Sequence, residues 1–393
     1  MSERKDALRS LFASLFGDNE PVYYSAPGRT EICGNHTDHQ HGKVLAASVN
    51  MDMMAAAAKN GTNTVRVKSG NYPMFTVCLD SLEPNEKEYG TSVGLVRGVC
   101  AGIAALGYEI SGFDMCVQSD VLQGSGLSSS AAFEILVGAV IGGLFCNDEL
   151  TATQLAIIGQ RSENVFFGKP CGLMDQMASA WGGIIEIDFN DPSKPVVEGI
   201  DFDFASKEHS LCMIDIGSDH ANLTGEYAAI PAELRSVSGY FGKSALREVN
   251  EAEFVAAIPE LRAQFGDRAV LRAKHIFDEN RRVEKICAAL KAGDFDGFLH
   301  QIRESGLSSW LYLQNVVVCG AVQDQSAALA LALCSSVLGE RGAYRIHGGG
   351  FGGTVQAFVP NDLLDTFKTT IEAVYGKGSC HVMQIRPVGF AKE

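Results

Sequence analysis

The sequence predicts an α+β fold. Segments with helical periodicity and segments with strand-like character occur in separate runs along the 393 residues, without the regular alternation of a doubly wound sheet. Glycine, with 42 residues, clusters in short motifs beside these segments. The expected helices are 6–16, 92–106, 129–145, 152–167, 251–265, 269–292 and 322–338. The expected strands are 21–25, 64–68, 75–79, 113–118, 183–189, 211–216, 354–359 and 381–388.

The length and composition indicate a globular chain of two domains. A chain of 393 residues can bury sizeable cores, and 46% hydrophobic with 20% charged residues excludes disorder as its main character. The turn-rich segment NDPSKP at 190–195 is the best candidate for a domain boundary between the predicted elements. We therefore expect domains at 1–190 and 191–393.

The charge balance argues against nucleic acid or membranes as partners. Lys and Arg number 32 against 47 Asp and Glu, which gives a net charge of −15, and we find no basic run that could offset it. The expected partners are therefore small molecules, and the expected assembly is a monomer or a weak homodimer.

The cysteines and the N-terminus suggest a cytoplasmic protein. The 11 cysteines are odd in number and scattered, without a CxxC pair, which is typical of free thiols in a reducing compartment. No apolar segment resembling a secretory signal follows the start. The longest apolar stretch, 135–146, contains three glycines and is too short to cross a bilayer.

A glycine- and serine-rich loop, SDVLQGSGLSSSAA at 119–132, follows an expected strand and opens an expected helix. Glycines let backbone N–H groups approach phosphate oxygens, and the helix N-terminus favours negative charge, so the pattern favours a phosphate-binding loop. A serine N-cap after a flexible turn is the structural alternative. A dinucleotide motif would need glycine at 129, where serine stands. The candidate contacts are Gly124, Ser125, Gly126, Leu127, Ser128, Ser129 and Ser130.

The segment APGRTEICGNHTDHQHG at 26–42 concentrates polar side chains. His36, His39 and His41 with a nearby aspartate suggest a metal site, but residues this close on a loop converge poorly on one tetrahedral ion. Arginine, asparagine, histidine and aspartate together offer donors and acceptors suited to adjacent sugar hydroxyls. A polyol site is therefore favoured, and a polar surface turn is the alternative.

Two further motifs complete the set. Asp175, within GLMDQ at 172–176, is expected on a short helix, half-buried, as a base or an anchoring charge, with Glu163 upstream. The segment RIHGGGFGGT at 345–354 contains a GxGxxG pattern, but a strand rather than a helix is expected to follow it. That excludes a dinucleotide fingerprint and leaves a glycine clamp beside a ligand.

Together these four motifs, in this order and spacing, resemble the GHMP small-molecule kinases and, within them, the galactokinase family. The similarity extends from about residue 20 to 390. The resemblance implies a two-domain α+β fold with the active site in the cleft between the domains. It also implies ATP and Mg²⁺ as cosubstrates and transfer of the ATP γ-phosphate to the anomeric hydroxyl of galactose.

The resemblance implies a role for each matching residue. Arg29 and Asp175 stand at the catalytic pair, and Ser130 and Glu163 at the magnesium ligands. The matching sugar contacts are Asn35, His36, Asp38, Gly172 and Tyr227, and Gly349 and Gly350 join the phosphate loop in the nucleotide site.

The chain also departs from the galactokinase pattern. Asn35 stands where glutamate is usual, Glu31 where asparagine is usual, and Leu122 where proline is usual. Losing a carboxylate beside the sugar's C6 removes a repulsion against uronic acids, and DHQ at 38–40 and SGLSS at 305–309 resemble the galacturonokinase branch. A kinase for galacturonate or another galactose-like sugar is therefore the alternative. A non-catalytic sugar sensor is more distant, since the loop, Arg29 and Asp175 are intact, and a metal-dependent hydrolase is more distant still.

Overall fold

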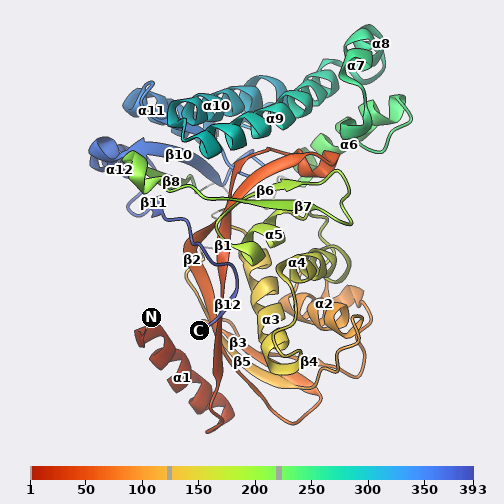
Figure 1. Ribbon diagram of the computed structural model, residues 1–393, viewed down its shortest axis with the longest axis vertical. Coiled ribbons are helices and arrows are strands. Elements are labelled where there is room, and N and C mark those ends of the chain that lie inside the picture. Colours follow the sequence, from red (N-terminus) through yellow and green to blue (C-terminus); the bar gives the residue numbers. More distant parts are fainter. Residues whose placement is uncertain (1, 122–125, 218–223) are drawn as a thin grey trace.

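The computed structural model describes residues 2–121, 126–217 and 224–393, and a long antiparallel pair of strands runs through its centre (Figure 1). These strands are β1 (Val22–Cys33) and β2 (Lys43–Lys59). The first part of β2 pairs with β6 and the last part with β5, so one strand serves two regions of the larger sheet. The other strands of this sheet are β3 (Thr64–Ser69), β4 (Phe75–Cys78), β5 (Phe113–Ser119), β6 (Ile184–Asp188), β7 (Val196–Ile200) and β12 (Ala391–Lys392).

A smaller antiparallel sheet has the order β11-β8-β10-β9. Its strands are β8 (His209–Asp215), β9 (Ala343–Ile346), β10 (Thr354–Pro360) and β11 (Cys380–Met383). In the larger sheet β3 and β5 pair in parallel, and the other pairings are antiparallel. This pattern confirms the predicted α+β class.

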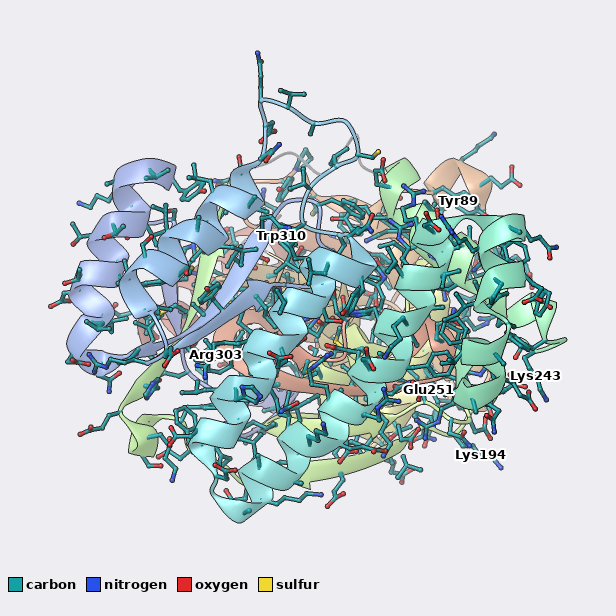
Figure 2. The ribbon with its side chains drawn as sticks, turned by 90° about the horizontal axis from the view of Figure 1, so that it is seen from above. Tyr89, Lys194, Lys243, Glu251, Arg303 and Trp310 are labelled. Carbon is teal, nitrogen blue, oxygen red and sulfur yellow. The ribbon has the colours of Figure 1, made fainter. Side chains whose placement is uncertain are left out.

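Helices cover both sheets. In Figure 1, α2 to α5 pack on one face of the larger sheet and α1 on the other, while α9 and α10 lie side by side in an outer layer that Figure 2 shows from above. The helices are α1 (Ser2–Phe16), α2 (Ser92–Ala104), α3 (Ser129–Phe145), α4 (Ala152–Arg161), α5 (Met174–Trp181), α6 (Thr224–Tyr240), α7 (Glu251–Ala256), α8 (Ile258–Phe265), α9 (Asp267–Ala292), α10 (Phe295–Ser308), α11 (Ser326–Leu338) and α12 (Leu364–Tyr375). Two π-helical turns, η3 (Ser162–Phe166) and η7 (Ser309–Leu313), extend α4 and α10.

Local sequence explains several of these elements, and tertiary packing explains others. A capping box between Thr151 and Gln154 starts α4, and Gly293 in the left-handed region ends α9. The prediction missed β2, because its run Ala55–Ala58 has weak strand propensity and is stabilised by complete burial. It also missed α6, α10 and α12, and the expected strand at 381–388 ends at Met383.

The largest correction concerns the segment 26–42. Residues 26–33 belong to β1 and are fully buried, so the polar surface turn considered as an alternative is wrong for this half. The register between β1 and β2 is irregular between Pro27 and Arg29 and again between Glu31 and Cys33. Such bulges re-aim side chains and are common beside active sites.

The predicted domain boundary falls in the turn between β6 and β7, which pair as a hairpin of the larger sheet. The chain crosses to the smaller sheet between Ile200 and His209, and β12 returns to pair with β1. The main hydrophobic core crosses the predicted boundary, because Met213 and Phe298 from the second half pack in the same cluster as many residues from the first half. The division at 190 stays a prediction. Within the described ranges, no helix has the length and apolar character needed to span a membrane.

A cluster of phenylalanines packs α10 against β10 of the smaller sheet. Phe298 on α10 is fully buried and contacts Phe204 and Phe358 with ring centroids at 5.4 and 4.9 Å. Replacing Phe298 by alanine should lower the free energy of unfolding by about 3–5 kcal/mol, because it leaves a cavity in a close-packed core. Leu307→Ala on the same helix is the control, since Leu307 is 52% exposed and should cost less than about 1 kcal/mol. Equal effects in chemical denaturation would contradict this account.

Candidate active site

Arg29 and Asp175 form a two-point ion pair between β1 and α5. Nε of Arg29 donates to Oδ1 of Asp175 and Nη2 donates to Oδ2, both at 2.6 Å. Nη1 of Arg29 also bonds to the carbonyl oxygen of Gly126, and the backbone N–H of Arg29 donates to that of Leu127 at 3.1 Å. The two residues predicted to be catalytic are therefore tied directly to the phosphate loop.

Asp175 is ionised at neutral pH. Burial opposes its charge, but the charge and hydrogen bonds of Arg29, with a hydrogen bond from Ser128, outweigh burial and hold the pKa of Asp175 below its usual value. Asp175 also lies in the first turn of α5, where the helix dipole favours a negative charge. Its side chain remains 26% exposed, so a substrate hydroxyl can reach it.

Two residues in the described part of the predicted phosphate loop have positive φ angles. Gly126 has φ +72°, and a side chain there would collide with Oγ1 of Thr354 at the start of β10. Ser128 stands at the N-cap position before α3 in the left-handed region, at φ 55°, but its side chain makes no capping hydrogen bond, so the alternative of a capping serine finds no support at Ser128. Gly124 and Ser125 lie outside the described residues.

Ser130 and Glu163 meet beside this loop. Oγ of Ser130 donates to Oε1 of Glu163 at 3.2 Å, across α3 and the π turn η3. Glu163 is 2% exposed, and Nζ of the exposed Lys169 also lies 3.3 Å from Oε1. A hydroxyl and a carboxylate oxygen form a donor set that suits Mg²⁺.

The predicted sugar contacts gather with the C-terminal glycine motif. The ring Nε2 of His36 lies 3.0 Å from the carbonyl oxygen of Gly349, and the hydroxyl of Tyr227 donates to that of Gly350 at 2.6 Å. A Cβ at Gly172 would collide with the carboxylate of Asp38 where that side chain now lies, so a larger residue there would displace Asp38. Segments distant in the chain, at 36–38, 172 and 349–350, therefore come together.

The histidines of this segment do not form a metal centre. Burial lowers the pKa of His36 to about 3, helped by nearby His39, so His36 is neutral. Among the described residues, no cluster of three or more His, Cys, Asp or Glu side chains could hold a metal ion. The metal-dependent hydrolase therefore finds no support.

Comparisons with known proteins show the family of this chain. Residues 10–59 match the galactokinase galactose-binding signature, and residues 94–183 match the GHMP kinase N-terminal domain. The chain is 33% identical to the galactokinase of Actinobacillus pleuropneumoniae over 371 residues, which cover 90% of this chain and 88% of the relative. It is 32% identical to the galactokinase of Glaesserella parasuis over 379 residues, which cover 94% of this chain and 93% of the relative. The chain belongs to the galactokinase family.

Solved structures also resemble the fold of this chain. Lactococcus lactis galactokinase complexed with galactose matches with a TM-score of 0.86 and 27% identity, over 99% of this chain and 100% of that chain. Methanococcus jannaschii mevalonate kinase matches with a TM-score of 0.66 at 13% identity, over 93% and 99%, which shows a shared fold alone.

Two of the departures from the galactokinase pattern, Glu31 and Asn35, are in contact with each other, and the third, Leu122, lies outside the described residues. Nδ2 of Asn35 donates to Oε1 of Glu31 at 3.1 Å, and Oε1 also accepts from Nη2 of Arg345 at 2.8 Å. Relative to the usual galactokinase pattern, the amide and the carboxylate of positions 31 and 35 have exchanged places, and both groups are still present. Asn35 is fully buried and also bonds to the carbonyl of Gly348 and to Asn315. Its direct contact with a sugar stays a prediction, because such a contact would displace one of these bonds.

Sequence reasoning missed the carboxylate that holds the backbone of this galactokinase motif. Oε1 of Glu279, fully buried on α9, accepts from the backbone N–H groups of Gly34 and Asn35 and from Oγ of Ser305. Burial opposes its charge, yet Arg282 and other nearby cations hold the pKa of Glu279 well below its usual range. An acid among the buried positions of an amphipathic helix was the available signal.

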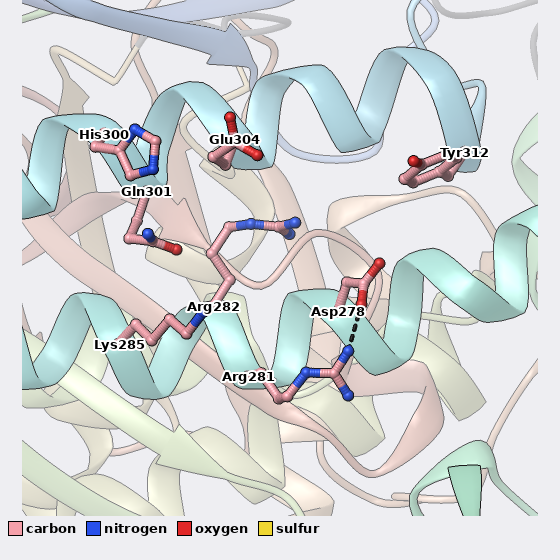
Figure 3. A pocket seen from close by; sticks show the side chains of 8 residues that line it. All are labelled: Asp278, Arg281, Arg282, Lys285, His300, Gln301, Glu304 and Tyr312. Carbon is pink, nitrogen blue, oxygen red and sulfur yellow. Dashed lines mark hydrogen bonds and ion pairs between the residues drawn. The ribbon is translucent and has the colours of Figure 1, made fainter. Parts of the chain in front are cut away.

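A polar pocket of about 360 Å³ lies on the outer side of this network, between α9 and α10 (Figure 3). Arg282, which lines it, is already paired with Glu279, and Arg281 is paired with Asp278 and Glu251. The pocket also holds Glu304 beside His300 and Lys285. Since acids compensate these arginines, the pocket offers an incoming charged ligand little attraction.

The exchange between positions 31 and 35 can be tested by a double-mutant cycle. Glu31→Asn alone leaves Arg345 buried without its carboxylate, which should lower the free energy of unfolding by about 3–5 kcal/mol. Adding Asn35→Glu returns a carboxylate to the same network, with an expected favourable coupling of about 1–3 kcal/mol. Urea unfolding of the four proteins measures this coupling. Additive effects would show that the two positions are independent.

Proposed function

We propose that this protein is an ATP-dependent galactokinase that transfers the γ-phosphate of ATP to the anomeric hydroxyl of galactose. The observation that carries the proposal is the Arg29–Asp175 ion pair, which is bonded to the phosphate loop and sits beside the clustered sugar motif. Membership of the galactokinase family supports it. Galactose leads over galacturonate because the compared relatives are galactokinases and one solved relative is complexed with galactose.

In this mechanism the ionised Asp175 accepts a hydrogen bond from the anomeric hydroxyl and takes its proton as the sugar oxygen bonds to the γ-phosphorus, while the bond from that phosphorus to the β–γ bridging oxygen breaks and ADP leaves. Arg29 holds both carboxylate oxygens, so Asp175 cannot rotate away from the hydroxyl. The same guanidinium adds positive charge beside the transferred phosphate, and the backbone N–H groups at the start of α3 add their dipoles.

Ser130 and Glu163 are the residues that would hold Mg²⁺. Their oxygen atoms lie 3.2 Å apart at the N-terminal end of α3, and both are hard donors of the kind that this ion prefers. When bound, the ion supplies charge neutralisation for the triphosphate.

The sugar site uses the histidine, aspartate, glycine and tyrosine predicted for it. A neutral His36 donates through Nε2 to the carbonyl oxygen of Gly349, which leaves Nδ1 as an acceptor for a sugar hydroxyl, and the carboxylate of Asp38 accepts from sugar hydroxyls. Gly172 leaves the space that Asp38 occupies, so the site depends on the absence of a side chain there. We further infer that the site lies in a cleft between the two predicted domains, and the monomer or weak homodimer stays a prediction.

A substrate panel tests the proposal. Purified protein with ATP and Mg²⁺ should release ADP with galactose and give galactose 1-phosphate, with kcat/KM for galactose above that for galacturonate. A preference for galacturonate would make the uronic acid the substrate. Binding of ATP and galactose without ADP release from any hexose or uronic acid would point to a sugar sensor.

The role of Asp175 is tested by Asp175→Asn, which keeps the shape and removes the charge. We expect kcat to fall by about 10²–10⁴-fold while KM for galactose changes much less, since the charge acts mainly in the transition state. Asp191→Asn, in an exposed turn, is the matched control and should keep wild-type kinetics. A near-normal kcat in Asp175→Asn would remove Asp175 from the chemical step.

A further inference from the structure

The side chain of Gln176 joins two buried carboxylates, only one of which the proposed mechanism uses. Gln176 follows Asp175 on α5 and is fully buried. Its Nε2 donates to Oε2 of Glu163 and to Oε2 of Glu134, both at 3.0 Å. The amide therefore has a fixed orientation, because turning it over would point its oxygen at two acceptors.

Glu134 lies on α3 one helical turn after Ser130, so the two share a face of the helix. It is 1% exposed and accepts a hydrogen bond from Nε2 of Gln176. Gly159 on α4 makes room for this contact, because a Cβ there would come within 3.1 Å of both Gln176 Cγ and Glu134 Oε2. Burying a carboxylate costs free energy unless the group is hydrogen-bonded, so the packing around Glu134 indicates that this side chain has a role in the site.

Glu163 needs to be held in place. Its Oε1 faces Ser130, and Nζ of the exposed Lys169 lies 3.3 Å from the same oxygen. Without a fixed Oε2, the carboxylate could rotate about its side chain and pair with the lysine in several ways. The bond from Gln176 to Oε2 fixes the carboxylate plane and leaves Oε1 toward the phosphate loop.

We propose that Gln176 and Glu134 are positioning residues that orient the Glu163 carboxylate for the divalent cation that accompanies the nucleotide. Glu134 holds the amide of Gln176, and Gln176 holds Glu163. The inference rests on the proposed function in assigning Glu163 to the cation. Groups outside a metal's direct ligands commonly set its affinity in this way.

The test measures Mn²⁺ binding in the presence of ADP by the loss of the free Mn²⁺ paramagnetic resonance signal, which requires no turnover. Gln176→Met keeps the side-chain length and removes both donors, and we expect Mn²⁺ affinity to fall about 10–100-fold. The dissociation constant of galactose should stay within about threefold, since a misfolded site would lose both ligands. Wild-type Mn²⁺ affinity in this variant would overturn the proposal.

Two comparisons separate positioning from general damage. Gln356→Met removes two donor bonds from another fully buried glutamine, on β10, and should leave Mn²⁺ affinity unchanged. Glu134→Gln keeps an acceptor for Gln176 and should keep the affinity, whereas Glu134→Leu should weaken it. Equal loss in both Glu134 variants would overturn the role of Glu134. A wild-type protein that binds Mn²⁺ with ADP but phosphorylates no sugar would refute the proposed function and leave this inference standing.

Discussion

The buried ion pair between Arg345 and Glu31 joins the two sheets at the point where the site is built. Both side chains lie away from solvent, with Nη2 of Arg345 2.8 Å from Oε1 of Glu31. Nη1 of Arg345 also donates to the carbonyl oxygen of Ile32 at 2.9 Å. Because a buried arginine is costly unless its charge is paired, these bonds from the two Nη groups hold β9 of the smaller sheet against β1 of the larger one.

The rest of the site follows from this junction. Arg29 lies two residues before Glu31 on β1, and Asn35 lies four residues after it. His347, two residues after Arg345, accepts the backbone N–H of Glu31 through Nε2 at 3.0 Å. Burial lowers the pKa of His347 well below its usual value, so it stays neutral beside the two arginines and can accept this bond. Arg29, the segment predicted to bind the sugar and the C-terminal glycines are thus positioned by one network.

A second feature is the division of labour among buried acids. Asp175 and Glu279 keep their charge because arginines lie against them, and their pKa values are lowered. Burial raises the pKa of Glu134 well above its usual value, reinforced by the neighbouring charge of Glu163. Asp175 thus lies at the predicted reacting centre, and Glu279 fixes the backbone of the predicted sugar motif. Glu134 accepts a hydrogen bond from the amide of Gln176.

The sequence by itself predicted the α+β class and the four motifs, because glycine-rich turns and amphipathic, capped helices such as α4 depend on local physics. It also located the exchange of amide and carboxylate at positions 35 and 31. Only the tertiary structure decided that β2 is a strand despite its alanines, and that Glu279, Arg345 and Gln176 support the site. The reason is that a buried polar residue takes its role from partners distant in the chain, and spacing along the sequence carries no record of which partner it meets.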